Sequence, residues 1–172
     1  MIVRESGMSF PIIDESLFFH IERSNLYKSI QEGVKVAEFI KLDDQFCYIF
    51  EAKTSSPNPN NKMNHNDLRF DQFIEEIKDK FVNTFSIYFA NRLKRHGEAS
   101  YTEMPSSFQN ANLKTLNFKF ILIIKDHKLD WLAPVNDELK KRINGFLKSW
   151  NIKEINLKVL NEELARANGF IN

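Results

Sequence analysis

The sequence has few of the residues that define disulfide-rich, fibrous or low-complexity proteins. Its only cysteine is Cys47, so no intramolecular disulfide can form. With five glycines and five prolines in 172 residues, the chain is neither collagen-like nor a flexible linker. Phe46 and Tyr48 flank Cys47, and we therefore interpret its thiol as a small buried hydrophobic group rather than as a nucleophile.

Long apolar segments are also missing. The longest apolar run covers residues 120–124, far short of the roughly 20 residues that a membrane-spanning helix needs. Residues 1–5 have no apolar core of the kind found in signal peptides. We therefore expect a soluble, cytoplasmic protein that does not associate with membranes.

Neither sign of charge predominates over the whole chain. The formal net charge of +1 excludes a uniformly basic nucleic-acid-binding surface. The charges are nevertheless unevenly distributed, because residues 1–51 carry nine acidic and five basic side chains, and residues 114–153 carry nine basic and four acidic ones. The acidic segment 1–51 could bind a metal ion, and the basic segment 114–153 could bind a phosphate. Alternatively, the two segments form solvated faces of opposite charge.

The chain does contain enough apolar residues for a sizeable core. Hydrophobic residues make up 42% of the sequence, and 16 residues are phenylalanine. A length of 172 residues is typical of one domain, so we expect a single domain over residues 1–172.

Hydrophobic periodicity predicts an α/β fold with a mixed β-sheet, a central hairpin and helices on both faces of the sheet. The expected strands are residues 16–24, 34–42, 46–54, 117–125 and 155–160. The expected helices are a short turn over 25–31, a long helix from a cap at Asn66 or Asp67 to Gly97, a helix over 137–150, and a final short helix capped by Asn161. Residues 55–66 and 97–116 are expected to be loops.

The predicted hairpin brings together residues that could carry out chemistry. Glu51 and Lys53 share one face of its second strand because side chains in a strand alternate. If the turn is centred on residues 44–45, Glu38 lies directly opposite Glu51, about 5 Å away. A turn one position earlier pairs Val36 with Glu51 instead and still keeps Glu38 on that face.

Two adjacent carboxylates need a compensating charge, and a hard divalent cation such as Mg²⁺ supplies it through oxygen ligands and water. Such an ion polarises a phosphate oxygen, and Lys53 could orient or help deprotonate a bound water. These are the requirements of phosphodiester hydrolysis. The acid-x-Lys triplet itself is not specific, because others begin at Glu76, Asp126 and Glu138. The hairpin context favours the triplet at Glu51, and Asp126-His127-Lys128 is its rival.

With Phe50-Glu51-Ala52-Lys53 closing a strand after Glu38 in the preceding one, residues 16–125 resemble the PD-(D/E)XK nuclease superfamily. The resemblance implies a restriction-endonuclease-like fold, Mg²⁺ or Mn²⁺ as cofactor, and DNA or RNA as substrate. It implies that Glu38 and Glu51 are the acidic metal ligands, that the Ala52 carbonyl is a third ligand, and that Lys53 is the catalytic lysine. Glu22 is similar to the additional upstream glutamate of many members. Glu rather than the usual Asp at position 38, with no proline before it, departs from the family pattern.

Other interpretations of the same residues remain open. Glu51 and Lys53 could form cross-strand ion pairs on an exposed strand face, and Lys80 on the long helix could reach a phosphate but is interpreted as a solvated side chain. The expected function is that of a nuclease, for example in microbial defence or nucleic-acid handling. The alternative is a non-catalytic nucleic-acid- or protein-binding module that keeps the nuclease fold, and a homodimer or a partner protein is compatible with either.

Overall fold

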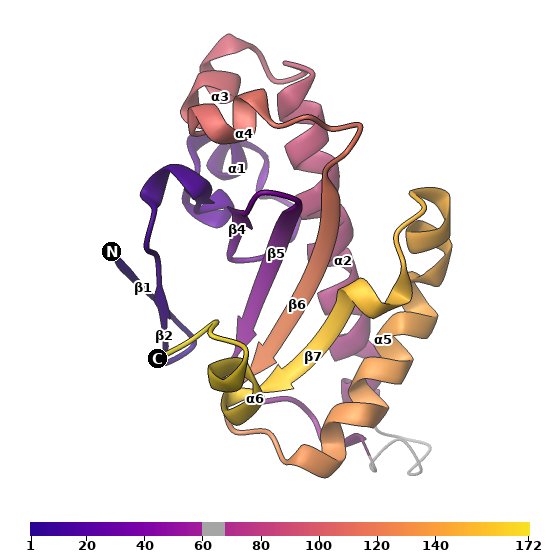
Figure 1. Ribbon diagram of the computed structural model, residues 1–172. Helices are drawn as coiled ribbons and strands as arrows, with labels where there is room; N and C mark the ends of the chain where they lie inside the picture. The colour runs from indigo at the N-terminus through magenta and orange to yellow at the C-terminus, as the bar shows by residue number, and fades with distance from the viewer. Residues whose placement is uncertain (60–67) are drawn as a thin grey trace.

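A five-stranded mixed sheet forms the centre of the computed structural model, which describes residues 1–59 and 68–172 (Figure 1). In spatial order, its strands are β3 (Phe18–Phe19), β4 (Phe39–Leu42), β5 (Phe46–Lys53), β6 (Asn117–Ile124) and β7 (Leu157–Asn161). The first two pairings are antiparallel and the last two are parallel. The predicted α/β class, with a mixed sheet and a hairpin at its centre, is therefore confirmed.

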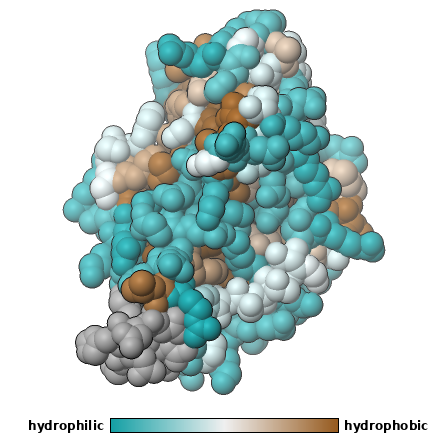
Figure 2. All heavy atoms as spheres, turned by 180° about the vertical axis from the view of Figure 1, so that it is seen from behind, coloured by the Kyte–Doolittle hydropathy of each residue, from teal (hydrophilic) through white to brown (hydrophobic). Residues whose placement is uncertain are grey.

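Two long helices, α2 (Arg69–Arg92) and α5 (Leu129–Ser149), cover one face of the sheet (Figure 1). The apolar residues of α2 recur at helical spacing and are buried, as with Ile74, Ile77 and Phe81. The ring of Phe81 packs 5.4 Å from that of Phe120 on β6. Seen from behind, this side of the molecule is mostly hydrophilic, with separate small hydrophobic patches (Figure 2). The apolar stripes of both helices thus face the sheet.

The other face of the sheet is covered by a two-stranded hairpin and a short helix. The hairpin consists of β1 (Ile2–Glu5) and β2 (Met8–Pro11), and the helix is α6 (Glu162–Ala167). Phe10 of the hairpin packs against Phe39 and Phe50 of the sheet, at ring distances of 5.1 and 6.2 Å. Helices do lie on both faces, but the second face carries only a short one, and its hairpin was not predicted.

The hairpin of β4 and β5 has the expected register, with Phe39 opposite Phe50 and Leu42 opposite Cys47. Its turn is closed by Asp43, whose backbone N–H donates to the Phe46 carbonyl at 2.9 Å. The first strand begins at Phe39 instead of residue 34. Its predicted start is wrong because the backbone N–H of Ala37 donates to the Thr84 hydroxyl on α2, at 2.8 Å.

Two other segments differ from the sequence prediction. Only Phe18–Phe19 of the predicted strand 16–24 is extended, because 3₁₀ turns at Glu15–Leu17 and Ile21–Arg23 interrupt it. The predicted loop 97–116 contains two short helices, α3 (Glu98–Glu103) and α4 (Ser106–Asn110). Both misassignments concern short elements whose periodicity is too brief to show in the sequence.

The predicted helices are present, with shifted ends. Helix α1 (Asn25–Ile30) is capped by Ser24, and α6 is capped by Asn161 as expected. Helix α5 begins at Leu129 rather than at residue 137 and includes Pro134. The predicted cap at Asn66 or Asp67 lies outside the described residues. None of the helices described is long and apolar enough to span a bilayer.

The buried position of Phe81 allows a test of the fold. We expect Phe81→Ala to lower the free energy of unfolding by about 3–5 kcal/mol, because the lost ring leaves a cavity under β6. The control is Ile13→Ala, since Ile13 is 95% exposed and its truncation should change stability by less than about 0.5 kcal/mol. Urea unfolding followed by circular dichroism measures both. A single transition is expected for a single domain, and equal effects of the two variants would contradict this packing.

Candidate functional site

The end of the β4–β5 hairpin brings the predicted acidic residues together. Continuation of the observed register places Glu38 directly opposite Glu51. The backbone N–H of Glu38 donates to the Phe50 carbonyl at 3.0 Å, so the pairing extends one residue beyond β4. Alternation along β5 directs Glu51 and Lys53 toward the face that α2 covers. Glu51 is buried on this face, so the predicted alternative of an exposed strand face is wrong, although Glu51 and Lys53 do form ion pairs.

Glu51 is a fully buried carboxylate, with a side-chain exposure of 0%. Its Oε1 accepts a hydrogen bond from Lys80 Nζ on α2 at 2.8 Å and lies 3.3 Å from Lys53 Nζ. Its Oε2 is buried and has no hydrogen-bond partner among the described residues. Burial raises the pKa of Glu51, and the two ammonium groups only partly oppose that shift. One oxygen of a buried carboxylate is therefore left without a partner.

Glu38 is a second acid of the site with a raised pKa. Burial, a hydrogen bond to Glu22 and the negative charges of Glu51 and Glu22 raise its pKa to about 9. Glu22 is held beside it by its own backbone N–H, which donates to the Glu38 carbonyl at 3.4 Å. The raised pKa favours the protonated form of Glu38, and its carboxyl group is hydrogen-bonded to that of Glu22. The structure thus places Glu22 beside Glu38 and Glu51, whereas the predicted group on this face was Glu38, Glu51 and Lys53.

Lys53 connects the buried carboxylate to the surface. Its Nζ lies 2.8 Å from Glu76 Oε1 on α2, and Glu76 also accepts a hydrogen bond from Lys35 Nζ at 3.1 Å. The hydrogen bond from Lys53 lowers the pKa of Glu76. Lys53 is thus partly buried and bonded to two carboxylates, one on its own strand and one on the helix.

The cluster contains four carboxyl groups and three amino groups. They belong to Glu22, Glu38, Glu51 and Glu76, and to Lys35, Lys53 and Lys80. A carboxyl group must lose its proton to ligate a metal ion, and the raised pKa of Glu38 opposes that loss. Metal binding and the ionisation of Glu38 are therefore coupled.

The backbone carbonyl of Ala52 already has a hydrogen-bond partner in the structure. It accepts a hydrogen bond from the Ser6 hydroxyl at 2.9 Å, from the turn between β1 and β2. Because carbonyls two residues apart in a strand point to the same side, the Ala52 carbonyl points toward the line of β4, as the Phe50 carbonyl does. A role for this carbonyl as a metal ligand remains a prediction, and Ser6 would have to share it.

The residues fit a hydrated Mg²⁺ or Mn²⁺ ion better than a closed protein cage. Within the described ranges, no set of three or more His, Cys, Asp or Glu side chains is arranged to hold a metal. Mg²⁺, however, is commonly held by one or two carboxylates and several waters. Glu38 and Glu51 supply two carboxyl groups, and Oε2 of Glu51 is a buried oxygen without a partner.

Two residues of the cluster were not foreseen. The interpretation of Lys80 as a solvated side chain is wrong, since its side chain is 11% exposed and bonds Glu51. Glu76 begins one of the other acid-x-Lys triplets, and the sequence argument favoured the triplet at Glu51 over it because of the hairpin. The available signal was the position of both residues beside the buried stripe of α2, next to Ile77 and Phe81. In the rival triplet, Asp126 and Lys128 are exposed and only His127 is buried.

Comparison with known proteins gives no match to this chain among family models, curated sequences or solved structures.

The raised pKa of Glu38 has a consequence for stability. The folded protein keeps this proton up to about pH 9, whereas an ordinary glutamate releases it near 4.5. The folded state therefore binds more protons between these values, and stability should fall as the pH rises through this range. We expect Glu38→Gln to reduce this fall, because the amide stays neutral, and to be more stable than wild type at pH 8. Melting temperatures measured from pH 5 to 9 without divalent ions test this.

The control is Glu32→Gln, which removes an exposed carboxylate and should keep the pH dependence of the wild type. If Glu38→Gln and wild type lose stability in parallel with rising pH, Glu38 is ionised in the folded protein and the described cluster is wrong.

Proposed function

We propose that this protein is a metal-dependent phosphodiesterase of the PD-(D/E)XK type that acts on DNA or RNA. The single observation that carries the proposal is the meeting of Glu38, Glu51 and Lys53 at the end of the hairpin, with Oε2 of Glu51 buried and unpartnered. Perturbed carboxyl groups that face one another are more frequent at functional sites than elsewhere. A restriction-endonuclease-like arrangement of the mixed sheet is part of the same proposal.

Each residue has a role that follows from its position. Glu38 and Glu51 would hold the ion, which when bound supplies Lewis-acid polarisation of the phosphate and a more acidic water. Lys80 fixes Oε1 of Glu51 and leaves Oε2 available. Lys53 places an ammonium group 3.3 Å from Glu51, where it can donate to a phosphate oxygen or to the attacking water. Glu22 forms a side-chain hydrogen bond with Glu38 and helps to raise the pKa of Glu38.

A non-catalytic binding module is the second candidate, and one observation favours it. Lys53 and Lys80 already compensate the charge of Glu51, and Glu76 holds Lys53 at 2.8 Å. A cluster closed in this way can serve as a structural ion-pair network. The two candidates differ in whether a divalent ion displaces these contacts.

Metal binding is the first test of the proposal. We expect Mn²⁺ to bind at millimolar concentration or below in isothermal titration calorimetry, with a proton released from Glu38. The release appears as a dependence of the measured heat on the ionisation enthalpy of the buffer. Glu51→Gln should lose binding, whereas Glu154→Gln, a change at an exposed position, should not. Equal binding by wild type and Glu51→Gln would show that the cluster holds no ion.

Catalysis is the second test. We expect Lys53→Met to lower nucleic-acid cleavage by about a hundredfold or more, because a positioned charge beside the phosphate is lost. Methionine keeps most of the aliphatic stem of Lys53. Because Lys53 pairs with buried Glu51, the melting temperature should also fall, and cleavage must be assayed well below it.

The matched control is Lys158→Met, which changes an exposed strand lysine on β7. Its activity should equal that of wild type. If wild type is inert on single-stranded DNA, duplex DNA and RNA with either Mg²⁺ or Mn²⁺, the binding module replaces the phosphodiesterase as the better account.

A further inference from the structure

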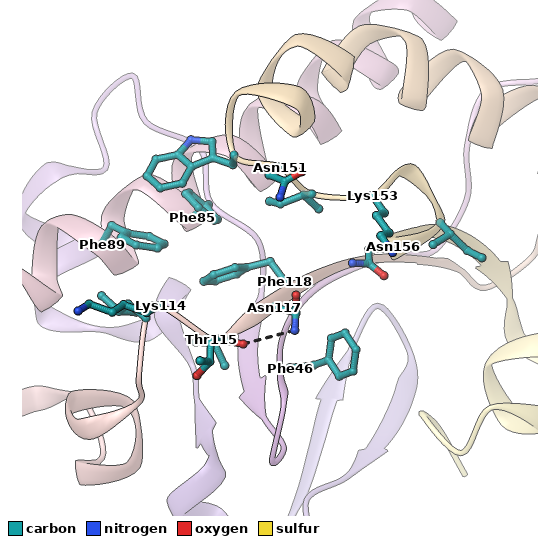
Figure 3. Close-up of a pocket in the computed structure, with 15 residues that line it drawn as sticks. Phe46, Phe85, Phe89, Lys114, Thr115, Asn117, Phe118, Asn151, Lys153 and Asn156 are labelled. Atoms are coloured by element: carbon teal, nitrogen blue, oxygen red, sulfur yellow. Dashed lines mark hydrogen bonds between the residues drawn. The ribbon is translucent and has the colours of Figure 1, made fainter.

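A pocket of about 640 Å³ opens at the other end of β5, away from the carboxylate cluster (Figure 3). It lies where β5 and β6 begin and where α2 and α5 end. Its walls consist of aromatic, aliphatic, amide and lysine side chains. The lining residues are Phe46, Phe85, Phe89, residues 113–118, residues 150–153, Ile155 and Asn156.

Aromatic rings form one wall of the pocket, and their positions are fixed by mutual packing (Figure 3). The ring of Trp150 lies 4.7 Å from that of Phe85 and 5.0 Å from that of Phe89. Phe85 in turn packs 4.6 Å from Phe118 of β6. Trp150 is 49% exposed. A flat ligand can therefore stack on a preformed aromatic surface without any rearrangement of the core.

The end of α5 holds Trp150 and Asn151 in place. The backbone N–H groups of Trp150 and Asn151 donate to the carbonyls of Phe146 and Lys148, at 3.2 and 3.1 Å. Asn151 has a φ of 53°, the left-handed conformation that asparagine tolerates at the end of a helix. The part of the pocket wall formed by Trp150 and Asn151 is thus held in place by the backbone hydrogen bonds that end α5.

The polar lining is cationic and rich in amides. Lys114 and Lys153 lie on opposite sides of the pocket, and Asn117, Asn151 and Asn156 lie between and beside them (Figure 3). None of the lining residues is acidic. Lysine ammonium groups bind phosphate, and asparagine amides both donate and accept hydrogen bonds at the edge of a heterocycle. This chemistry favours an anion with a planar polar ring over a cation or a purely apolar molecule.

We propose that this pocket binds a nucleobase together with its phosphate, either as a free mononucleotide or as one unpaired nucleotide of a single strand. Its volume falls within the range of about 300–1,000 Å³ that is usual for small-molecule sites. The base stacks on Trp150 and Phe89, the asparagine amides contact its edge, and the phosphate lies against Lys114 or Lys153. No divalent ion takes part, so the proposal goes beyond the phosphodiesterase function and does not depend on it.

Tryptophan fluorescence offers a direct test, because the chain has two tryptophans and Trp131 is not in the pocket. In a Trp131→Phe background, the signal comes from Trp150 alone. Adenosine monophosphate is titrated in excess EDTA, with adenosine and inorganic phosphate as partial ligands. We expect saturable quenching by adenosine monophosphate, and affinity at least about tenfold weaker for either partial ligand. A short oligoadenylate in a parallel titration distinguishes a free nucleotide from a strand.

Substitutions of the residues that line the pocket test where adenosine monophosphate binds. Lys114→Ala and Lys153→Ala should together weaken binding by about tenfold or more, whereas Lys148→Ala, an exposed lysine near the end of α5 that does not line the pocket, should not. By calorimetry, Trp150→Ala should weaken binding by about tenfold, and Trp150→Phe should largely restore it because it keeps an aromatic face. Melting temperatures verify that each variant is folded.

The outcomes separate this proposal from the metal site. Glu51→Gln should bind adenosine monophosphate as wild type does, whatever its effect on metal binding or cleavage. Binding of the oligoadenylate alone would identify a strand as the source of the nucleotide. The proposal is overturned if neither ligand binds at millimolar concentration. It is also overturned if the folded lysine and Trp150→Ala variants bind as tightly as wild type.

Discussion

The ion pairs that keep the carboxylate of Glu51 in the interior determine how the rest of the site is built. Glu51 lies on β5, between β4 and β6, and α2 covers it completely. A buried carboxylate without partners costs several kcal/mol, and Lys80 and Lys53 offset that cost at 2.8 and 3.3 Å. Because Lys80 comes from α2, the pair also fixes where this helix crosses the sheet. Replacing a buried ion pair by apolar residues of similar volume often leaves stability unchanged or raises it, so buried ion pairs are weak evidence of a purely stabilising role.

The divalent cation proposed above would account for the carboxylate cluster. Burial, together with the neighbouring Glu22 and Glu51, raises the pKa of Glu38 to about 9, and Oε2 of Glu51 has no partner among the described residues. A divalent cation would relieve both features at once. The start of the same strand, about 17 Å away at 3.3 Å per residue, has the opposite chemistry, with lysines and aromatic rings around a pocket. The two ends of β5 thus have different chemistry, which we propose suits a divalent cation at one end and a nucleotide at the other.

The sequence predicted the hairpin and its register well, because alternation on both sides of residues 43–45 leaves few other pairings. It also predicted the long helix α2. The partnership of Lys80 with Glu51 could not be predicted, since it depends on how α2 lies across the sheet, which periodicity does not specify. The β1–β2 hairpin was missed although a signal existed. Ser6 and Gly7 separate two short strands, and their φ values of 49° and 72° are those of a tight two-residue hairpin turn.

The central claim, that Glu38 and Glu51 bind a divalent cation, is tested most directly by diffraction from crystals soaked in Mn²⁺. The anomalous signal of manganese locates the ion independently of activity. The account predicts a peak within bonding distance of carboxylate oxygens of both Glu38 and Glu51, with waters in the remaining positions. A cluster that keeps all of its lysine contacts, with no anomalous peak near Glu51 at saturating Mn²⁺, would contradict it.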